Sequence, residues 1–252
     1  MLIRPGIELA NLTDVGCHRA NNEDYYCYAE PEDDEAFREK GRLAIVADGM
    51  GGHEGGQVAS SIAVETVRDA YLNCVDGDPR AALSRAFENA HAAIHAYVVK
   101  HPELAGMGTT CTCAVLRDGQ LFYGHVGDSR LYLIRGSTIS RITDDHSYVA
   151  RMVRAGLITE EAAATHPQRN VLTAALGMES AVPVDLSETP LALEPGDLLL
   201  LSTDGLHGLV TDNELLSIAA ANAPAAACKA LVDLAKERGG FDNITVQILR
   251  VV

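Results

Sequence analysis

The spacing of apolar residues along the chain predicts a mixture of strands and helices. An apolar run over residues 42–48 predicts a buried strand that leads into a glycine-rich segment. Apolar side chains then recur at intervals of three and four from Ala59 to Tyr71, which predicts an amphipathic helix. A second helix is predicted to begin at Pro79, with Asp78 as its N-cap. Two successive helices with one apolar face each require a broad surface on which to pack.

Alternating runs in the rest of the chain predict the sheets that provide this surface. Residues 109–126 form a predicted hairpin around Asp118-Gly119, a pair that suits a type I′ turn. Further strands are predicted at 130–135, 138–142, 198–202 and 244–252, and further helices begin near Thr211 and Pro224. Strand runs mixed with helix pairs are typical of the α+β class. Because no repeat or linker divides the chain, we expect one domain over residues 1–252.

Two segments depart from this regular pattern. Between residues 146 and 177 the pattern becomes helical and carries Arg151, Arg154 and Arg169, which we interpret as an excursion from the sheet. The acidic stretch 30–40 is expected to be a solvated hairpin loop.

Net charge is the compositional feature that restricts function most. The 252 residues include 35 Asp and Glu against 20 Lys and Arg, which gives a net charge of −15. Nucleic-acid backbones require a basic footprint on the protein, so we exclude them as the main partner. If an acidic protein handles an anion, a bound cation must first invert the local field.

The cysteines and the apolar runs bear on the cellular compartment. The six cysteines are dispersed, without a CxxC pair, and residues 1–10 do not resemble a secretory leader. No apolar run approaches the roughly 18 residues that a spanning helix requires. We therefore expect a cytoplasmic protein that does not cross a membrane.

Carboxylates recur where predicted strands begin or end, and they are candidate metal ligands. They are Glu23, Asp24, Asp48, Asp128, Asp204 and Asp242. If these strand ends meet at one sheet edge, like charges about 4 Å apart cost roughly 4 kcal/mol at an effective dielectric of 20. A hard divalent cation resolves this conflict, and an all-oxygen ligand set favours Mg²⁺ or Mn²⁺ over zinc. A single Asp at a strand end is more often a turn or cap residue than a metal ligand. The metal-site interpretation therefore depends on the sequence contexts of all these residues taken together.

Five short motifs contain these carboxylates. They are RANNEDY (19–25), VADGMGGH (46–53), VGDSR (126–130), STDGL (202–206) and FDNITV (241–246). In this order they resemble the motifs of the PP2C-type (PPM) metal-dependent serine/threonine protein phosphatases, from about Thr13 to the C-terminus. Residues 144–178 resemble the segment called the flap in bacterial members, and we use that name for them. The resemblance implies a central antiparallel β-sandwich flanked by pairs of helices, with the flap near the active site.

The resemblance also implies which residues bind metal most directly. Asp48 would bridge two metal ions, and Gly49 would offer its backbone carbonyl to one of them. Asp204 and Asp242 would each hold a metal ion directly. Three direct carboxylates are chemically sufficient, because Mg²⁺ keeps several of its waters.

The remaining candidates would act around these ligands. Glu23 would act mostly through bound water, Asp24 would support that arrangement, and Asp128 would contribute to a third, weaker metal site. Arg19 would clamp the substrate phosphate, since a guanidinium binds two phosphate oxygens in a planar fork. Asn243 would support the neighbouring metal ligand.

The activity implied is hydrolysis of phosphoserine and phosphothreonine in proteins by direct attack of a metal-bridging hydroxide. Two metals activate water and stabilise both the attacking and the leaving oxygen. The bacterial form of the motifs further implies a cognate Ser/Thr kinase. Two alternatives stay open: a pseudophosphatase or phosphoprotein-binding module, and a broader small-molecule phosphomonoesterase.

The general acid is unassigned at this stage. Some family members place a His directly after the first Asp-Gly, where it is thought to protonate the leaving group, but here that residue is Met50. His53 lies three residues further on, and a loop His is more often solvated than catalytic.

Other patterns that suggest chemistry are weaker. Cys74 and Cys111 match the C-x5-R spacing of cysteine-dependent phosphatases. The first segment carries two Asp where an anion would bind, and the second alternates like a strand. His91 and His95 lie four apart on a predicted helix, where we favour a solvated surface over a zinc site.

Overall fold

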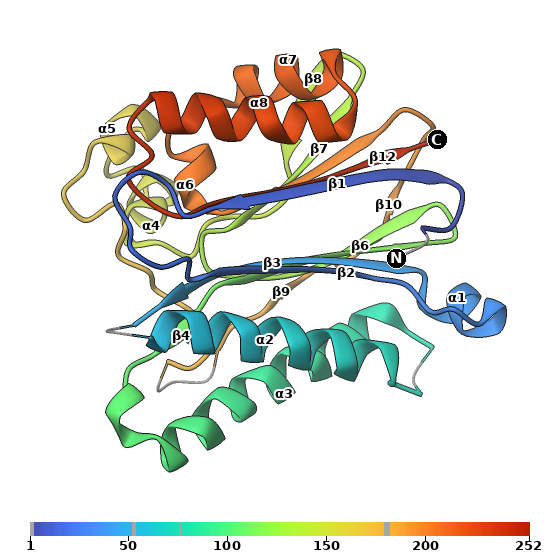
Figure 1. Cartoon of the computed structure of the whole chain (residues 1–252), viewed down its shortest axis with the longest axis horizontal. Coiled ribbons are helices and arrows are strands. Elements are labelled where there is room, and N and C mark those ends of the chain that lie inside the picture. The colour runs from blue at the N-terminus through green and yellow to red at the C-terminus, as the bar shows by residue number, and fades with distance from the viewer. Residues whose placement is uncertain (1–2, 52–53, 76, 179–181) are drawn as a thin grey trace.

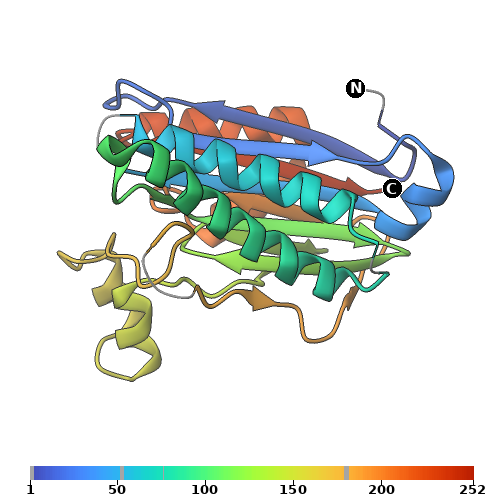
Figure 2. The same ribbon diagram turned by 90° about the horizontal axis from the view of Figure 1, so that it is seen from below.

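Two antiparallel sheets lie face to face, and helices cover their outer faces (Figure 1 and Figure 2). This arrangement is seen in a computed structural model, which describes residues 3–51, 54–75, 77–178 and 182–252. The predicted α+β class and the predicted central sandwich are both confirmed. In the described segments no helix is both long and apolar enough to cross a bilayer.

The first sheet has the strand order β1-β12-β11-β7-β8. Its strands are β1 (Ile7–Asp14), β12 (Ile244–Val251), β11 (Leu198–Ser202), β7 (Arg130–Arg135) and β8 (Thr138–Arg141). The second sheet has the order β10-β6-β5-β3-β2, while β4 pairs with β3 and β9 pairs with β6. Its strands are β2 (Asp24–Ala29), β3 (Arg42–Met50), β4 (Gly108–Thr109), β5 (Cys111–Arg117), β6 (Gln120–Val126), β9 (Asp185–Leu186) and β10 (Leu191–Ala192).

A pair of helices covers the outer face of each sheet (Figure 1). Helices α2 (Gly55–Leu72) and α3 (Pro79–Lys100) cover the second sheet, and α7 (Asp212–Ala221) and α8 (Pro224–Glu237) cover the first. The shorter helices are α1 (Asp34–Lys40), η1 (Pro102–Leu104), α4 (Tyr148–Arg154), α5 (Glu160–Ala164) and α6 (Asp204–His207).

Strand β3 shows why the apolar runs are continuous. Its Leu43 and Ile45 pack in the core beneath α2 and α3, whereas Ala44 and Val46 pack between the two sheets. Successive side chains of a strand point to opposite faces, so a central strand of a covered sheet must be apolar at every position.

Local signals in the sequence predicted several element ends correctly. Asp118 and Gly119 have φ angles of 53° and 70°, as a type I′ turn between β5 and β6 requires. The Asp78 carboxylate accepts a hydrogen bond from the Arg80 amide at the start of α3. Thr211 and Glu214 form the expected capping box of α7. These features depend on a few neighbouring residues, which makes them readable from sequence.

The acidic stretch 30–40 is not the solvated hairpin loop that we expected. It contains helix α1, whose N-cap Asp33 accepts hydrogen bonds from the amides of Glu35 and Ala36. The guanidinium carbons (Cζ) of Arg4 and Arg42 lie 4.6 and 4.9 Å from the centre of the Phe37 ring. A side-chain cap and tertiary packing of one aromatic ring therefore outweigh the acidic composition.

Two further expectations need correction. The excursion over 146–177 is helical only in α4 and α5, and the rest of it is turn or extended chain. His91 and His95 are half-buried rather than solvated, because the flap's end packs against α3. The Gly177 amide donates to His91 Nδ1 at 3.1 Å, and His95 Nε2 lies 3.1 Å from the Met178 carbonyl oxygen.

Candidate metal centre

The sheets bring the predicted carboxylates to one end of the sandwich. Asp24 and Asp48 face each other across β2 and β3. Asp204 follows β11, and Asp242 precedes β12, the strand paired with β11. Segments that are distant in sequence therefore meet because of strand pairing, as expected for a cluster at strand ends.

Burial and mutual repulsion raise the pKa values of these carboxyl groups. Burial raises the pKa of Asp48 well above its ordinary value, and the charges of Asp24 and Asp204 raise it further. Burial and the charge of Asp204 likewise raise the pKa of Asp128. Burial raises the pKa of Asp24 to about 7, although the hydrogen bonds that its carboxylate accepts lower the pKa. Without a cation, the cluster thus favours the protonated state at several positions.

Among the residues that the structure describes, two buried carboxylate oxygens have no hydrogen-bond partner. They are Oδ1 of Asp24 and Oδ1 of Asp204. Asp24 Oδ2, by contrast, accepts from the hydroxyl groups of Thr203 and Thr245 at 2.8 and 2.6 Å. Unpartnered buried oxygens are costly unless something absent from the chain satisfies them, and a hard cation does so.

Glu23 and Gly49 face a shared point beside Gly56. The Gly49 amide donates to the Glu23 backbone oxygen at 3.1 Å, which joins the two segments. A Cβ on Gly56 would lie 2.8 Å from both Glu23 Oε2 and the Gly49 carbonyl oxygen. The close approach of the α2 backbone to these two oxygens therefore requires glycine at position 56.

Arg19 pairs with a predicted metal ligand in this structure. Its Nη2 lies 2.6 Å from Asp242 Oδ2, and half of its side chain is exposed. Burial lowers the pKa of Arg19, but the hydrogen bond with Asp242 and the charges of Glu23 and Asp48 raise it overall. The guanidinium is therefore at the edge of the cluster and always charged.

Asn243 connects the loop that carries Arg19 and Glu23 to β12. Its Oδ1 accepts from the Glu23 amide at 2.8 Å, and its Nδ2 donates to the carbonyls of Val15 and Asn21 at 3.0 Å. These contacts fix the backbone of Glu23 and of the preceding loop relative to β12.

The described residues contain no group of three or more carboxylate, imidazole or thiol side chains gathered closely enough to hold an ion. The two oxygens of Asp242 accept hydrogen bonds from the Arg19 guanidinium and from the Asn243 amide.

Asp128 lies on the loop between β6 and β7, at the base of the flap. The preceding Gly127 has a φ of 107°, and a Cβ there would lie 2.5 Å from Thr110 Cγ2. The close approach requires glycine and positions Asp128 beside Asp204, whose charge contributes to the raised pKa of Asp128.

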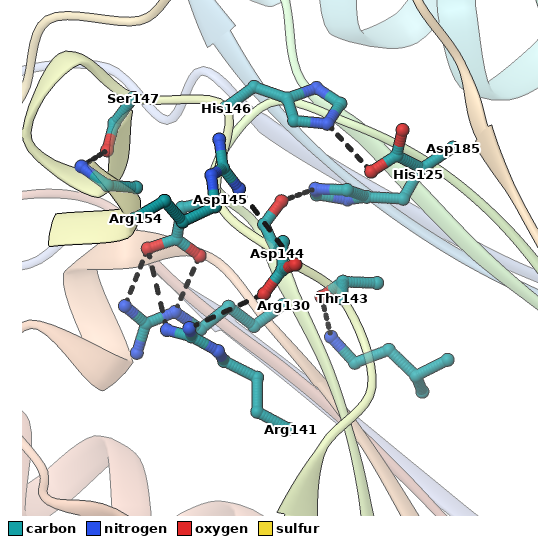
Figure 3. A network of polar contacts seen from close by, with 12 residues as sticks. His125, Arg130, Arg141, Thr143, Asp144, Asp145, His146, Ser147, Arg154 and Asp185 are labelled. Atoms are coloured by element: carbon teal, nitrogen blue, oxygen red, sulfur yellow. Dashed lines mark hydrogen bonds and ion pairs between the residues drawn. The ribbon is translucent and has the colours of Figure 1, made fainter. Parts of the chain in front are cut away.

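A polar network at the flap root was missed by sequence reasoning (Figure 3). Arg130 Nε and Nη2 bind the two oxygens of Asp145 at 2.9 and 2.7 Å. His125 Nε2 lies 3.0 Å from the Asp144 carbonyl, and His146 Nε2 lies 3.0 Å from Asp185 Oδ2. The Asp-Asp-His run at 144–146 is the signal that could have indicated this network. Arg130, although part of a predicted motif, is thus a structural residue.

Met50 ends β3, and His53 lies outside the described residues, so the general acid stays unassigned. Burial raises the pKa of Cys111 well above its ordinary value, which excludes it as a ready thiolate nucleophile.

The chain is similar in sequence to known phosphatases. The family described as "Protein phosphatase 2C" matches residues 29–236. Protein phosphatase PhpP of Streptococcus pneumoniae serotype 2 is 36% identical over 248 residues, which cover 96% of this chain and 97% of that protein. Serine/threonine phosphatase stp of Listeria welshimeri is 35% identical over 242 residues, which cover 94% and 93%.

Solved structures show the same likeness. The serine/threonine phosphatase PstP/Ppp of Mycobacterium tuberculosis is 35% identical, with a TM-score of 0.85 over 98% of this chain and 99% of that one. The catalytic domain of PstP in complex with two manganese ions has a TM-score of 0.84 at 34% identity, with the same coverage.

Proposed function

The chain belongs to the protein phosphatase 2C family, and from this premise we propose that it hydrolyses phosphoserine and phosphothreonine in proteins. The observation that carries the proposal is the cluster of buried and half-buried carboxylates with raised pKa values, two of which keep an oxygen without a hydrogen-bond partner among the described residues. Such a cluster is unfavourable on its own and suits divalent cations. The net charge of −15 makes a cation necessary before a phosphate can approach.

The donor set fits Mg²⁺ or Mn²⁺, because every candidate ligand is an oxygen. Asp48, Gly49, Asp204 and Asp242 would hold two ions, and Asp128 would contribute to a third, weaker site. Glu23 would act through water, and Asp24 would support it. Bound ions would act as Lewis acids and lower the pKa of water, so that water attacks phosphorus directly without a covalent phosphoenzyme.

The chain's own residues bind and orient the phosphate. When Asp242 turns to a cation, the Arg19 guanidinium is released at the edge of the cluster and becomes available to two phosphate oxygens. Thr203 and Thr245 hold one oxygen of Asp24 and leave the other free. Asn243 holds the loop that carries Arg19 and Glu23 in place.

The setting that we propose follows from the same premise. The substrates would be phosphoproteins made by a cognate bacterial Ser/Thr kinase, and the enzyme would act in the cytoplasm. One phosphatase domain would span residues 1–252, with the flap at 144–178.

A phosphothreonine peptide tests this proposal. Phosphate release should stop with EDTA and return with Mn²⁺ or Mg²⁺. Metal-loaded protein that binds the peptide without turnover would instead be a binding module. A preference for a small phosphomonoester over every peptide would indicate a broader phosphomonoesterase.

A further inference from the structure

A cavity of about 720 Å³ extends from the carboxylate cluster to the flap. Asp128, Asp204 and Asp242 line one end of it, and residues of α4 and α5 line the other. Ligand pockets in proteins measure roughly 300–1,000 Å³, so this volume exceeds what a phosphate needs. With a phosphate at the carboxylates, the flap end remains open to another part of the substrate.

Apolar side chains line part of the cavity, among charged and polar ones. Val149 and Val153 of α4 and Ala163 of α5 line it, and Leu209 and Phe241 line it from the sandwich. We call these five residues the apolar wall. Their side chains come from segments far apart in the sequence, and they share the cavity with the candidate metal ligands.

Phe241 connects the apolar wall to the carboxylate cluster. It directly precedes Asp242, and 62% of it is exposed. Its ring stacks on His18, with centroids 5.2 Å apart and an angle of 24° between the planes. A large aromatic ring that is held at a cavity rim and left open to solvent offers apolar contact to a ligand.

The charged side chains near the apolar wall balance one another. Arg141 and Arg154 lie 3.7 and 3.9 Å from the carboxylate of Asp144 (Figure 3). Arg169 and Glu160, of opposite charge, also line the cavity. With the pair of Arg130 and Asp145 and with Asp212, the flap end carries four arginines and four carboxylates, which favours an uncharged group over an acidic one.

We propose that the apolar wall binds an aliphatic side chain of the phosphoprotein substrate, close in sequence to the phosphoresidue. The inference rests on the proposed function and specifies its substrate class. Because the wall and the carboxylates line one cavity, a single short segment of substrate reaches both. An aliphatic side chain matched to such a wall changes kcat/KM by about tenfold or more.

A set of phosphothreonine peptides tests the proposal on the Mn²⁺-loaded full chain. Each peptide carries one Leu, Asp, Lys or Gly at a single position from three residues before to three residues after the phosphothreonine. We expect at least one position at which Leu raises kcat/KM about tenfold over Gly and over Asp.

Variants assign the preference to the apolar wall. Val153→Asp, and the milder Val153→Ala, should lower the ratio of kcat/KM for the Leu peptide to that for the Gly peptide. A ratio is independent of the fraction of folded enzyme. Leu157→Asp is the matched control, because Leu157 lies on the same flap and is 70% exposed, and it should leave the ratio unchanged.

Four outcomes would overturn the inference. Equal kcat/KM for Leu, Gly and Asp at every position removes the subsite, and a preference for Asp assigns recognition to the arginines instead. A Leu preference that both Val153 variants retain places the subsite elsewhere. If no peptide is hydrolysed at all, the proposed function fails, and the inference fails with it.

Discussion

The carboxylate cluster and the flap are held in place in different ways. Asp24 and Asp48 face each other because β2 and β3 pair in register, and β11 and β12 bring Asp204 and Asp242 to the same end. The flap contains only two helices, of seven and five residues, which are too short to be stable alone. It depends on side-chain contacts such as Arg130 with Asp145. Backbone pairing therefore positions the proposed chemistry, whereas a few polar contacts position the proposed substrate surface.

Removal of one central carboxylate should cause the largest loss of activity. It should affect kcat/KM and the stability of the fold in opposite directions. In Asp48→Ala or Asp204→Ala we expect kcat/KM to fall by about a thousandfold or more, equivalent to about 4 kcal/mol. The melting temperature in EDTA should rise, because a buried like charge is removed and strand pairing is unaffected. Activity assays and thermal unfolding measure the two effects. Retained activity, or a lower melting temperature in EDTA, would contradict this view of the cluster.

Removal of the flap-root ion pair should have the next largest effect. Asp145→Ala leaves the largely buried Arg130 without its partner, which costs about 3–5 kcal/mol in the free energy of unfolding. Urea denaturation measures this loss. Asp233→Ala breaks the exposed pair with Lys229 and is the matched control, expected to cost less than about 1 kcal/mol. Equal losses in the two variants would show that the flap root is not a stabilising contact.

Arg19→Ala should change substrate binding more than folding. Loss of a charge-assisted contact worth roughly 1.5–3 kcal/mol should raise KM about tenfold to a hundredfold. Arg19→Lys should not restore the wild-type KM, because an ammonium cannot form the planar fork. Arg68→Ala is the control for the loss of an arginine, because Arg68 is partly exposed and pairs with Asp69. A KM equal to that of the wild type would argue against the phosphate clamp.

Stability without metal should depend gradually on pH. The pKa of Asp24 is about 7 in the folded chain, chiefly through burial, against an ordinary value of 3.8. The folded state therefore keeps a proton that the unfolded state loses between about pH 4 and 7. The free energy of unfolding in EDTA should fall as pH rises through that window, by at most about 1.4 kcal/mol per pH unit for one proton. Denaturation at several pH values checks this, and a rise over the window would contradict it.

Features that depend on neighbouring residues could be predicted from sequence. The Asp118-Gly119 turn and the capping box of Thr211 and Glu214 each involve at most four consecutive residues. The acidic composition of residues 30–40 predicts a loop, but the Asp33 cap and the packing of Phe37 against distant arginines form helix α1 there. The contacts of His91 and His95 with the flap's end could not be predicted for the same reason.

The amino-acid order by itself determined the long helices, most of the strands and the set of candidate oxygen ligands, because periodicity and short motifs are local properties. Tertiary structure alone decided which of these groups meet. Arg19 and Asp242 lie 223 positions apart and share a hydrogen bond, and the apolar wall joins the flap to the sandwich. Tertiary structure also decides the raised pKa values of the carboxyl groups, because burial and charge repulsion depend on distance in space and not on distance along the chain.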